Sequence, residues 1–174
     1  MSNIAGSNGI VIRELSYRDI PSLVDIYIES FKGMNDERVV RRWIECKYRS
    51  KPISVYYVAS LEDRIVGYIL WTEHGGFRSD AVIELEQVAV RREFRGKGIA
   101  SKLIKDSLQR FTEEYINSRG ARLKLVIVTT SKDNAAKELY KRVLNASEVC
   151  TISDLYSTDE SILIAVMDRS IHKG

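Results

Sequence analysis

The segment from Val88 to Gln109 places an apolar run, a basic loop with two glycines and an amphipathic pattern directly after one another. The run Val88–Val90 has the composition of a strand, and apolar residues recur at helical spacing after the loop. Gly96 and Gly98 allow the backbone to turn tightly and a ligand to approach it closely. The segment therefore predicts a strand, a binding loop and a helix in succession.

An anion is the expected ligand of this loop. The first amide groups of a helix have no acceptor within the helix, and the positive end of the helix dipole lies behind them. Arg95 and Lys97 add two mobile cations at the same place, which indicates a phosphate or pyrophosphate. The glycine spacing fits neither the Walker A loop nor the Rossmann pattern. A plain glycine-rich turn before a helix is the alternative.

Length and composition indicate one soluble globular domain. We expect a frayed tail over residues 1–9 and a single domain over 10–174. The 27 Lys and Arg residues against 24 Asp and Glu give a net charge of +3, which makes a nucleic-acid partner unlikely unless the charges cluster. Apolar runs fall far short of the ~20 residues of a membrane helix, and there is no signal-peptide pattern, so we expect no membrane association and a cytoplasmic location.

The two cysteines, Cys46 and Cys150, have neither CxxC nor Cys/His spacing. This pattern indicates no disulfide framework and no zinc site. We therefore expect two buried or idle thiols, and no metal.

The alternation of helical and period-two patterns predicts a mixed α/β sheet with helices on both faces. Strands such as 125–128 are apolar on both sides, as in a sheet covered twice. The predicted order is β-α-α-β-β-β-α-β-α-β-β. Strands are expected over 10–15, a hairpin over 53–73, and then 81–90, 122–130, 147–157 and 160–169; helices are expected over 16–31, 36–50, from just after Gly98 to about Arg119, and 133–144.

Two motifs in this chain resemble those of the GNAT superfamily of N-acetyltransferases. The first, Q/R-x-x-G-x-G/A, is met by Arg95, Gly98 and Ala100. The second lies about forty residues later, in the sequence DNAAKELYKR, and is met by Asn134, Ala136, Leu139 and Tyr140. One departure is that Leu144 and Asn145 follow where the family often has a Gly-Phe pair.

The resemblance implies a mostly antiparallel central sheet of about seven strands, in which the strands ending at Val90 and near Thr130 splay apart to hold acetyl-CoA. The backbone of Val88, Ala89 and Val90 would pair with the pantetheine arm, and Asn134 would act at the mouth of the following helix. The amides that would hold the pyrophosphate are those of Gly96, Lys97, Gly98, Ile99, Ala100 and Ser101, beside the Arg95 side chain.

The resemblance also makes Tyr140 the proton donor to the departing CoA sulfur. A phenol with a pKa of ~10 can protonate a thiolate whose conjugate acid has a pKa of ~8.5. Because a thiolate leaves tolerably well unaided, loss of the hydroxyl should lower rather than abolish the rate. The alternative is a tyrosine that packs its ring in the core.

Glu84 and Glu86 share one face of the predicted strand 81–90, where carboxylates are costly unless they are paired or wetted. In some family members a glutamate at the place of Glu84 serves as general base, and either residue could do so here. A backbone N–H near Val88 would meet the developing oxyanion. The alternative for the glutamates is an exposed or salt-bridged position, for example beside Arg122 or Lys124.

These features predict an N-acetyltransferase that moves an acetyl group from acetyl-CoA to a primary amine by direct attack in a ternary complex. A protein N-terminus, a lysine side chain and a small amine all remain open as acceptors. His74 and the basic residues of 41–51 are expected at the surface, and Trp43 and Trp71 in the core or the acceptor pocket. The rival interpretation is a non-catalytic acyl-CoA-binding regulatory module. A homodimer through the last strands is expected by likeness only.

Overall fold

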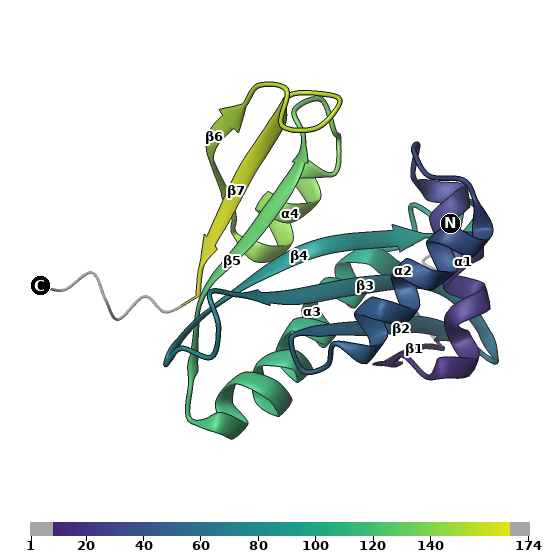
Figure 1. The fold of residues 1–174 in the computed structure, drawn as a ribbon, viewed down its shortest axis with the longest axis horizontal. Helices are drawn as coiled ribbons and strands as arrows, with labels where there is room; N and C mark the ends of the chain where they lie inside the picture. The colour runs from purple at the N-terminus through teal and green to yellow at the C-terminus, as the bar shows by residue number, and fades with distance from the viewer. Residues whose placement is uncertain (1–8, 168–174) are drawn as a thin grey trace, which may run out of the picture. The chain divides into compact units, whose positions relative to one another are not determined.

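The computed structural model describes residues 9–167, which form a mixed α/β fold with one seven-stranded sheet (Figure 1). The strand order is β1-β2-β3-β4-β5-β7-β6. The predicted succession of elements is confirmed, while residues 1–8, 168 and 169 of the predicted tail and last strand lie outside the described range. The strands are β1 Ile10–Glu14, β2 Ser54–Leu61, β3 Arg64–His74, β4 Asp80–Val90, β5 Arg122–Ser131, β6 Ser147–Ile152 and β7 Glu160–Val166; the helices are α1 Ile20–Ser30, α2 Glu37–Arg49, α3 Ile99–Phe111 and α4 Lys137–Leu144.

The chain divides into two compact units. Among the described residues, the first unit comprises 9–70 and 87–108, and the second comprises 71–86 and 109–167. Strands β3 and β4 each contribute to both, with the divisions at Leu70/Trp71 and Glu86/Gln87.

The core of the first unit lies between its strands and the helices α1 and α2. Leu23, Val24 and Ile26 of α1 and Ile44 of α2 are fully buried in this core. Tyr68 and Leu70 of β3 point into it as alternate residues of one strand. The apolar faces of the two helices therefore pack against the sheet, as the sequence predicts.

The other face of β3 meets α3 at Gly67. A Cβ built on Gly67 would lie 2.8 Å from the Ala89 carbonyl oxygen and 3.2 Å from side-chain carbons of Leu103 and Val90. Since Gly67 alternates with Tyr68 along the strand, α3 lies opposite α1 and α2. Helices thus cover both faces of this part of the sheet, and the glycine lets β4 approach without a clash.

The helices α2 and α1 of the first unit begin in different ways. The Asp36 carboxylate accepts hydrogen bonds from the amides of Arg38 (2.9 Å) and Val39 (3.4 Å), which fixes the start of α2. The predicted start of the first helix, just after Ser16, lies too close to the N-terminus, because a short 3-10 turn over Tyr17–Asp19 precedes the α-helix. The α-helix starts at Ile20, with Pro21 in its first turn, where a missing N–H is tolerated.

The second unit is built on β5, β7 and β6. β7 pairs antiparallel with both neighbours, and Val126 and Val128 of β5 are buried. β4 pairs parallel with β5 only from Asp80 to Glu84, opposite Arg122 to Ile127. The ladder ends there although both strands continue.

Both predicted helices of the second half are shorter than expected as α-helices. After Phe111 the chain continues in a π turn and a 3-10 turn, and Gly120 then closes it in the left-handed conformation (φ +74°), as its place predicts. The last helix begins at Lys137 rather than 133, because Asn134 forms a turn in which its side chain accepts from the Ala136 amide (2.9 Å). Asn145 takes the left-handed position after α4 (φ +56°).

No helix within residues 9–167 is long and apolar enough to cross a lipid bilayer. Cys46 and Cys150 are both free and exposed, so the prediction of unpaired thiols is confirmed and their burial is not.

The variant Gly67→Ala should lower the free energy of unfolding by roughly 1–3 kcal/mol, because the new methyl group meets a backbone carbonyl that can move only with β4. Denaturant unfolding measures the loss. Gly76→Ala is the control, because its Cβ would meet nothing within 4 Å. Its only expected cost is the ~1 kcal/mol of holding an alanine in the left-handed conformation. The NMR chemical shifts of the Ala89 and Val90 amides should change in Gly67→Ala and not in Gly76→Ala. Unchanged shifts in both variants would contradict the contact.

Candidate functional site

The loop between β4 and α3 has the geometry of an anion cradle. Gly96 and Gly98 both adopt the left-handed conformation (φ +75° and +79°), and a Cβ at either would meet nothing within 4 Å. The Gly98 carbonyl accepts the first helical hydrogen bond, from the Lys102 amide (3.0 Å). The amides of residues 99–101 therefore lie in the first turn, where a helix offers them no acceptor.

Arg95 is an anchor of this loop rather than the mobile cation that the sequence predicts. Its Nε donates to the Val90 carbonyl (2.9 Å) and one terminal nitrogen donates to the Ser30 hydroxyl (3.2 Å). Arg91 similarly donates through Nε to the Ile65 carbonyl (3.0 Å), and the Arg92 amide donates to Glu29. The start of the loop is thus held to β3, β4 and α1.

Lys97 supplies the positive charge that is less constrained. Its Nζ lies 5.0 Å from the centroid of the Phe94 ring, and the Arg64 guanidinium lies 5.3 Å from the same ring. A hydrogen bond from its own backbone lowers the pKa of the Glu93 carboxyl, and the ion pair with Arg64 lowers it further. The loop therefore combines a fixed frame with one adjustable cation, and its residues fit a phosphate group.

The strand glutamates have partners that the sequence did not predict. Glu84 Oε2 lies 2.7 Å from Nε2 of His74, and Glu86 Oε2 accepts from the Thr72 hydroxyl (2.6 Å). The two cations suggested as glutamate partners, Arg122 and Lys124, both lie next to Asp80 (2.6 and 3.7 Å). Two hydrogen-bonded pairs thus join β3 and β4, and their four side chains are treated together as one cluster: Thr72, His74, Glu84 and Glu86.

A buried ion pair lies beside this cluster. The Glu73 side chain is 4% exposed and forms a bidentate pair with Arg119, which also donates to the Tyr115 carbonyl (2.9 Å). The Arg119 guanidinium lies 5.3 Å from the Phe77 ring centroid. These contacts fasten the β3–β4 hairpin to the end of the long helical segment and so fix Thr72 and His74.

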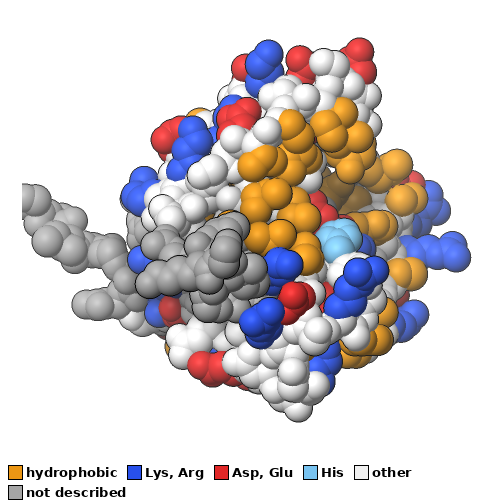
Figure 2. Space-filling model, turned by 90° about the vertical axis from the view of Figure 1, so that its left-hand side faces the viewer, with side chains coloured by type: hydrophobic (Ala, Val, Ile, Leu, Met, Phe, Trp, Pro, Cys, Tyr) orange, Lys and Arg blue, Asp and Glu red, His pale blue; other side chains and the backbone are white. Residues whose placement is uncertain are grey.

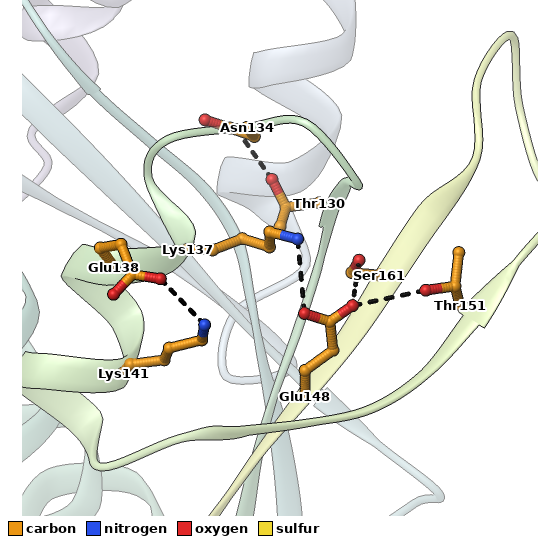
Figure 3. Close-up of polar contacts among 8 residues, drawn as sticks. All are labelled: Thr130, Asn134, Lys137, Glu138, Lys141, Glu148, Thr151 and Ser161. Atoms are coloured by element: carbon orange, nitrogen blue, oxygen red, sulfur yellow. Dashed lines mark hydrogen bonds and ion pairs between the residues drawn. The ribbon is translucent and has the colours of Figure 1, made fainter.

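Tyr140 lies on α4 and is 6% exposed. Burial raises its pKa to about 12, so the phenol is neutral at physiological pH. Figure 3 shows the polar contacts around this helix: Asn134 donates to the Thr130 hydroxyl (2.8 Å), and Lys137 pairs with Glu148 (3.3 Å), which also accepts from Ser161 (2.7 Å). The Asn134 side chain therefore caps its own turn.

An open pocket of about 340 Å³ lies in the first unit. Trp43 is the residue of its lining that the sequence predicts for an acceptor pocket, and the other tryptophan, Trp71, is buried in the core. A signal was available, because Val39 and Trp43 stand one turn apart on a helix that is otherwise rich in charge. The pocket is lined by Tyr27, Met34, Val39, Val40, Trp43 and Gln87.

The predicted site residues fall into the two units. Val88–Val90 and Arg95–Ser101 belong to the first, and Glu84, Glu86, Asn134 and Tyr140 to the second. Within residues 9–167 no three His, Cys, Asp or Glu side chains gather as they would around a metal ion. On the face shown in Figure 2, basic and acidic side chains are interspersed.

Comparisons with known proteins agree with this geometry. The sequence model of the Acetyltransferase (GNAT) family matches residues 20–145. The N-acetylaspartate synthetase of Xenopus tropicalis is 34% identical over 98 residues, which are 56% of this chain and 33% of that protein. The chain thus spans about a third of that relative's length.

Two solved structures share the fold. The ribosomal-protein-S18-alanine N-acetyltransferase of Escherichia coli matches with a TM-score of 0.72 and 12% identity, covering 95% of this chain and 98% of that one. A spermidine/spermine N-acetyltransferase of Vibrio cholerae matches with a TM-score of 0.68 and 15% identity, covering 91% and 92%. At these identities the likeness concerns the fold alone.

The variant Arg95→Lys should bind inorganic pyrophosphate about 10-fold more weakly, although it keeps the charge, because lysine cannot replace both guanidinium bonds to Val90 and Ser30. Lys97→Arg is the matched control and should retain the affinity. Calorimetric titration measures both. Wild-type affinity in Arg95→Lys would show that Arg95 acts by charge alone.

Tyr140 should ionise only as the pH approaches 12, whereas an exposed tyrosine ionises near pH ~10. Because the pKa is raised in the folded state, the stability it reflects is present below pH ~10 and is lost as the pH rises toward 12. Ultraviolet titration of phenolate in the native protein and in Tyr140→Phe gives the difference. If Tyr140→Phe lowers the absorbance change near pH ~10, then Tyr140 ionises as an exposed tyrosine does and the burial is contradicted.

Proposed function

The chain belongs to the GNAT family of acetyltransferases, and we propose that it transfers the acetyl group of acetyl-CoA to a primary amine by direct attack in a ternary complex. The observation that carries this proposal is the loop from Arg95 to Ser101. Two left-handed glycines, a helix N-terminus and an adjacent lysine form a cradle suited to a pyrophosphate. Its position directly after β4 matches the family motif.

The first unit would hold the donor, which supplies the reactive thioester. The backbone of Val88, Ala89 and Val90 would pair with the pantetheine arm, and the amides of residues 96–101 would bind the pyrophosphate. The Val90 carbonyl is already an acceptor for Arg95, so the pairing would rest mainly on Val88 and Ala89. A backbone N–H near Val88 would stabilise the oxygen on which negative charge develops.

Glu84 or Glu86 would accept the proton of the acceptor ammonium. A lysine-type amine, with a pKa of ~10.4, needs this step more than an α-amine with a pKa of ~7.8. His74 bears directly on Glu84, since its Nε2 lies 2.7 Å from that carboxylate. We propose that the pair takes up the proton together and that Glu84 orients the imidazole.

Tyr140 would assist the departing sulfur. Its pKa of about 12 lies well above the ~8.5 of a thiol, so complete proton transfer to the thiolate is uphill. A hydrogen bond from the neutral phenol to the developing thiolate needs no such transfer. We therefore propose that Tyr140 stabilises the leaving group mainly as a hydrogen-bond donor.

A non-catalytic acyl-CoA-binding module is the second candidate. It would need the cradle but neither the buried phenol nor the cluster around Glu84. The relative and the two solved structures are named for aspartate, for the alanine of a ribosomal protein and for spermidine or spermine. The acceptor of this chain must therefore be tested across those classes.

Release of free thiol from acetyl-CoA should require an amine and should fall in both Tyr140→Phe and Glu84→Gln. We expect a loss of at most ~10²-fold for Tyr140→Phe, the low end for general acid catalysis, because a thiolate leaves well. Glu84→Gln should act through proton removal, so its defect should shrink as the pH approaches the pKa of the acceptor. Thiol release against a panel of amines and peptides at several pH values measures this.

The control is acetyl-CoA affinity, which both variants should retain because neither residue belongs to the cradle. Tight binding of acetyl-CoA with no release for any amine would favour the binding module. A pH-independent defect in Glu84→Gln would remove this residue from proton transfer.

A further inference from the structure

The pocket of the first unit is lined by uncharged side chains, although the helix α2 beside it is rich in charged residues. α2 carries Glu37, Arg38, Arg41, Arg42, Glu45, Lys47 and Arg49. Yet Val39 and Trp43 of this helix, together with Met34 before it, are 46%, 37% and 51% exposed. Apolar side chains that remain in water around one hollow lower the free energy when a ligand covers them.

The six lining residues include no charged side chain. Their polar amide belongs to Gln87, whose Oε1 accepts a hydrogen bond from the Tyr68 hydroxyl (3.0 Å). Burial raises the pKa of Tyr68 well above its usual value, so this phenol stays a donor and fixes the amide. A charged group placed in the pocket would lose water without gaining a counter-charge from the lining.

The pocket adjoins the strand that would hold the donor. Gln87 directly precedes Val88 on β4, and all the lining residues lie in the same compact unit as Val88–Val90 and the Arg95–Ser101 loop. Successive residues of a strand advance by ~3.3 Å. The pocket is therefore lined by the residue next to the backbone proposed to hold the thioester arm.

We infer that this pocket binds the apolar side chain of the acceptor, so that the substrate is a primary amine carrying a bulky aliphatic or aromatic group. This inference rests on the proposed acetyl transfer and narrows it. The same chemistry is offered by a peptide whose first residue is large and apolar and by a free hydrophobic amine.

The size of the pocket fits such a group. An engineered apolar cavity of about 150 Å³ holds benzene, and this pocket of about 340 Å³ is roughly twice as large. Aspartate and spermidine, the acceptors for which two relatives are named, carry a second charge. Lys47, whose Nζ lies 5.4 Å from the Trp43 ring centroid, is outside the lining. We therefore expect this chain to discriminate against both.

The test compares acceptors that differ only in the side chain. Peptides beginning with Leu, Phe, Ala, Asp or Lys form one arm, and phenethylamine, aspartate and spermidine form the other. We expect kcat/KM to be at least ~10-fold higher for Leu and Phe than for Ala, and higher still relative to Asp. The arm that contains the best acceptor identifies the source of the amine.

The variant Val39→Asp places a carboxylate at the pocket wall. Position 39 lies in the first turn of α2, where an acidic residue is compatible with the helix dipole. It should reduce transfer to Leu and Phe peptides at least ~10-fold and improve transfer to the Lys peptide. Val149→Asp, a valine 55% exposed on β6, is the matched control and should leave the order of acceptors unchanged.

Equal rates across the peptides, or a preference for Asp or Lys in the native protein, would overturn the inference while leaving acetyl transfer intact. If no acceptor causes release of thiol from acetyl-CoA, the proposed function fails. Fluorescence of Trp43 then still tests whether the pocket binds an apolar amine. A change in emission with phenethylamine but not spermidine, lost in Val39→Asp, supports an apolar binding site. Absence of that selectivity overturns it.

Discussion

The hydrogen bond from Arg95 Nε to the Val90 carbonyl joins the end of β4 to the loop before α3. A strand end and a glycine-rich loop would each be free to change conformation without such a tie. With it, Gly96 and Gly98 turn from a fixed point, and the first amides of α3 hold a defined direction. The bonds of Arg91 to Ile65 and of the Arg92 amide to Glu29 extend the frame to β3 and α1. Binding by backbone amides depends on this rigidity, because amides cannot adjust as side chains do.

Local sequence was sufficient for most elements of the fold and for the glycine-rich turn before α3. The helix after Gly98, the hairpin turn and the left-handed stop at Gly120 depend on neighbouring residues, so their patterns are legible along the chain. The errors at helix starts have the same origin. Before α1 the chain forms a short 3-10 turn, and before α4 it forms the turn at Asn134, where the sequence predicts the first residues of each helix. Such turns and the first turn of a helix differ little in free energy, so the local pattern does not decide the exact start.

The side-chain partners could not be predicted, since they join residues that only the sheet register brings together. His74 meets Glu84 across the β3–β4 hairpin, and Arg95 reaches Ser30 over 65 positions of sequence. Asp80 contacts both Arg122 and Lys124 of β5, because the parallel register places it opposite Arg122. The pocket likewise draws on α1, α2 and β4, and its six members form no motif.

The two kinds of chemistry are assigned to different parts of the chain. Under the proposed function, recognition of the donor and of an apolar group depends on the first unit, through backbone amides, glycines and uncharged side chains. The proposed proton transfer depends on the second, through Glu84, His74 and the buried Tyr140. An apolar pocket selects by surface removed from water, which changes little with pH, whereas removal of a proton from the acceptor ammonium depends on pH directly. Acceptor choice should therefore be set independently of the pH dependence of transfer, and a change of substrate requires new side chains on α1 and α2 without a new set of acids and bases.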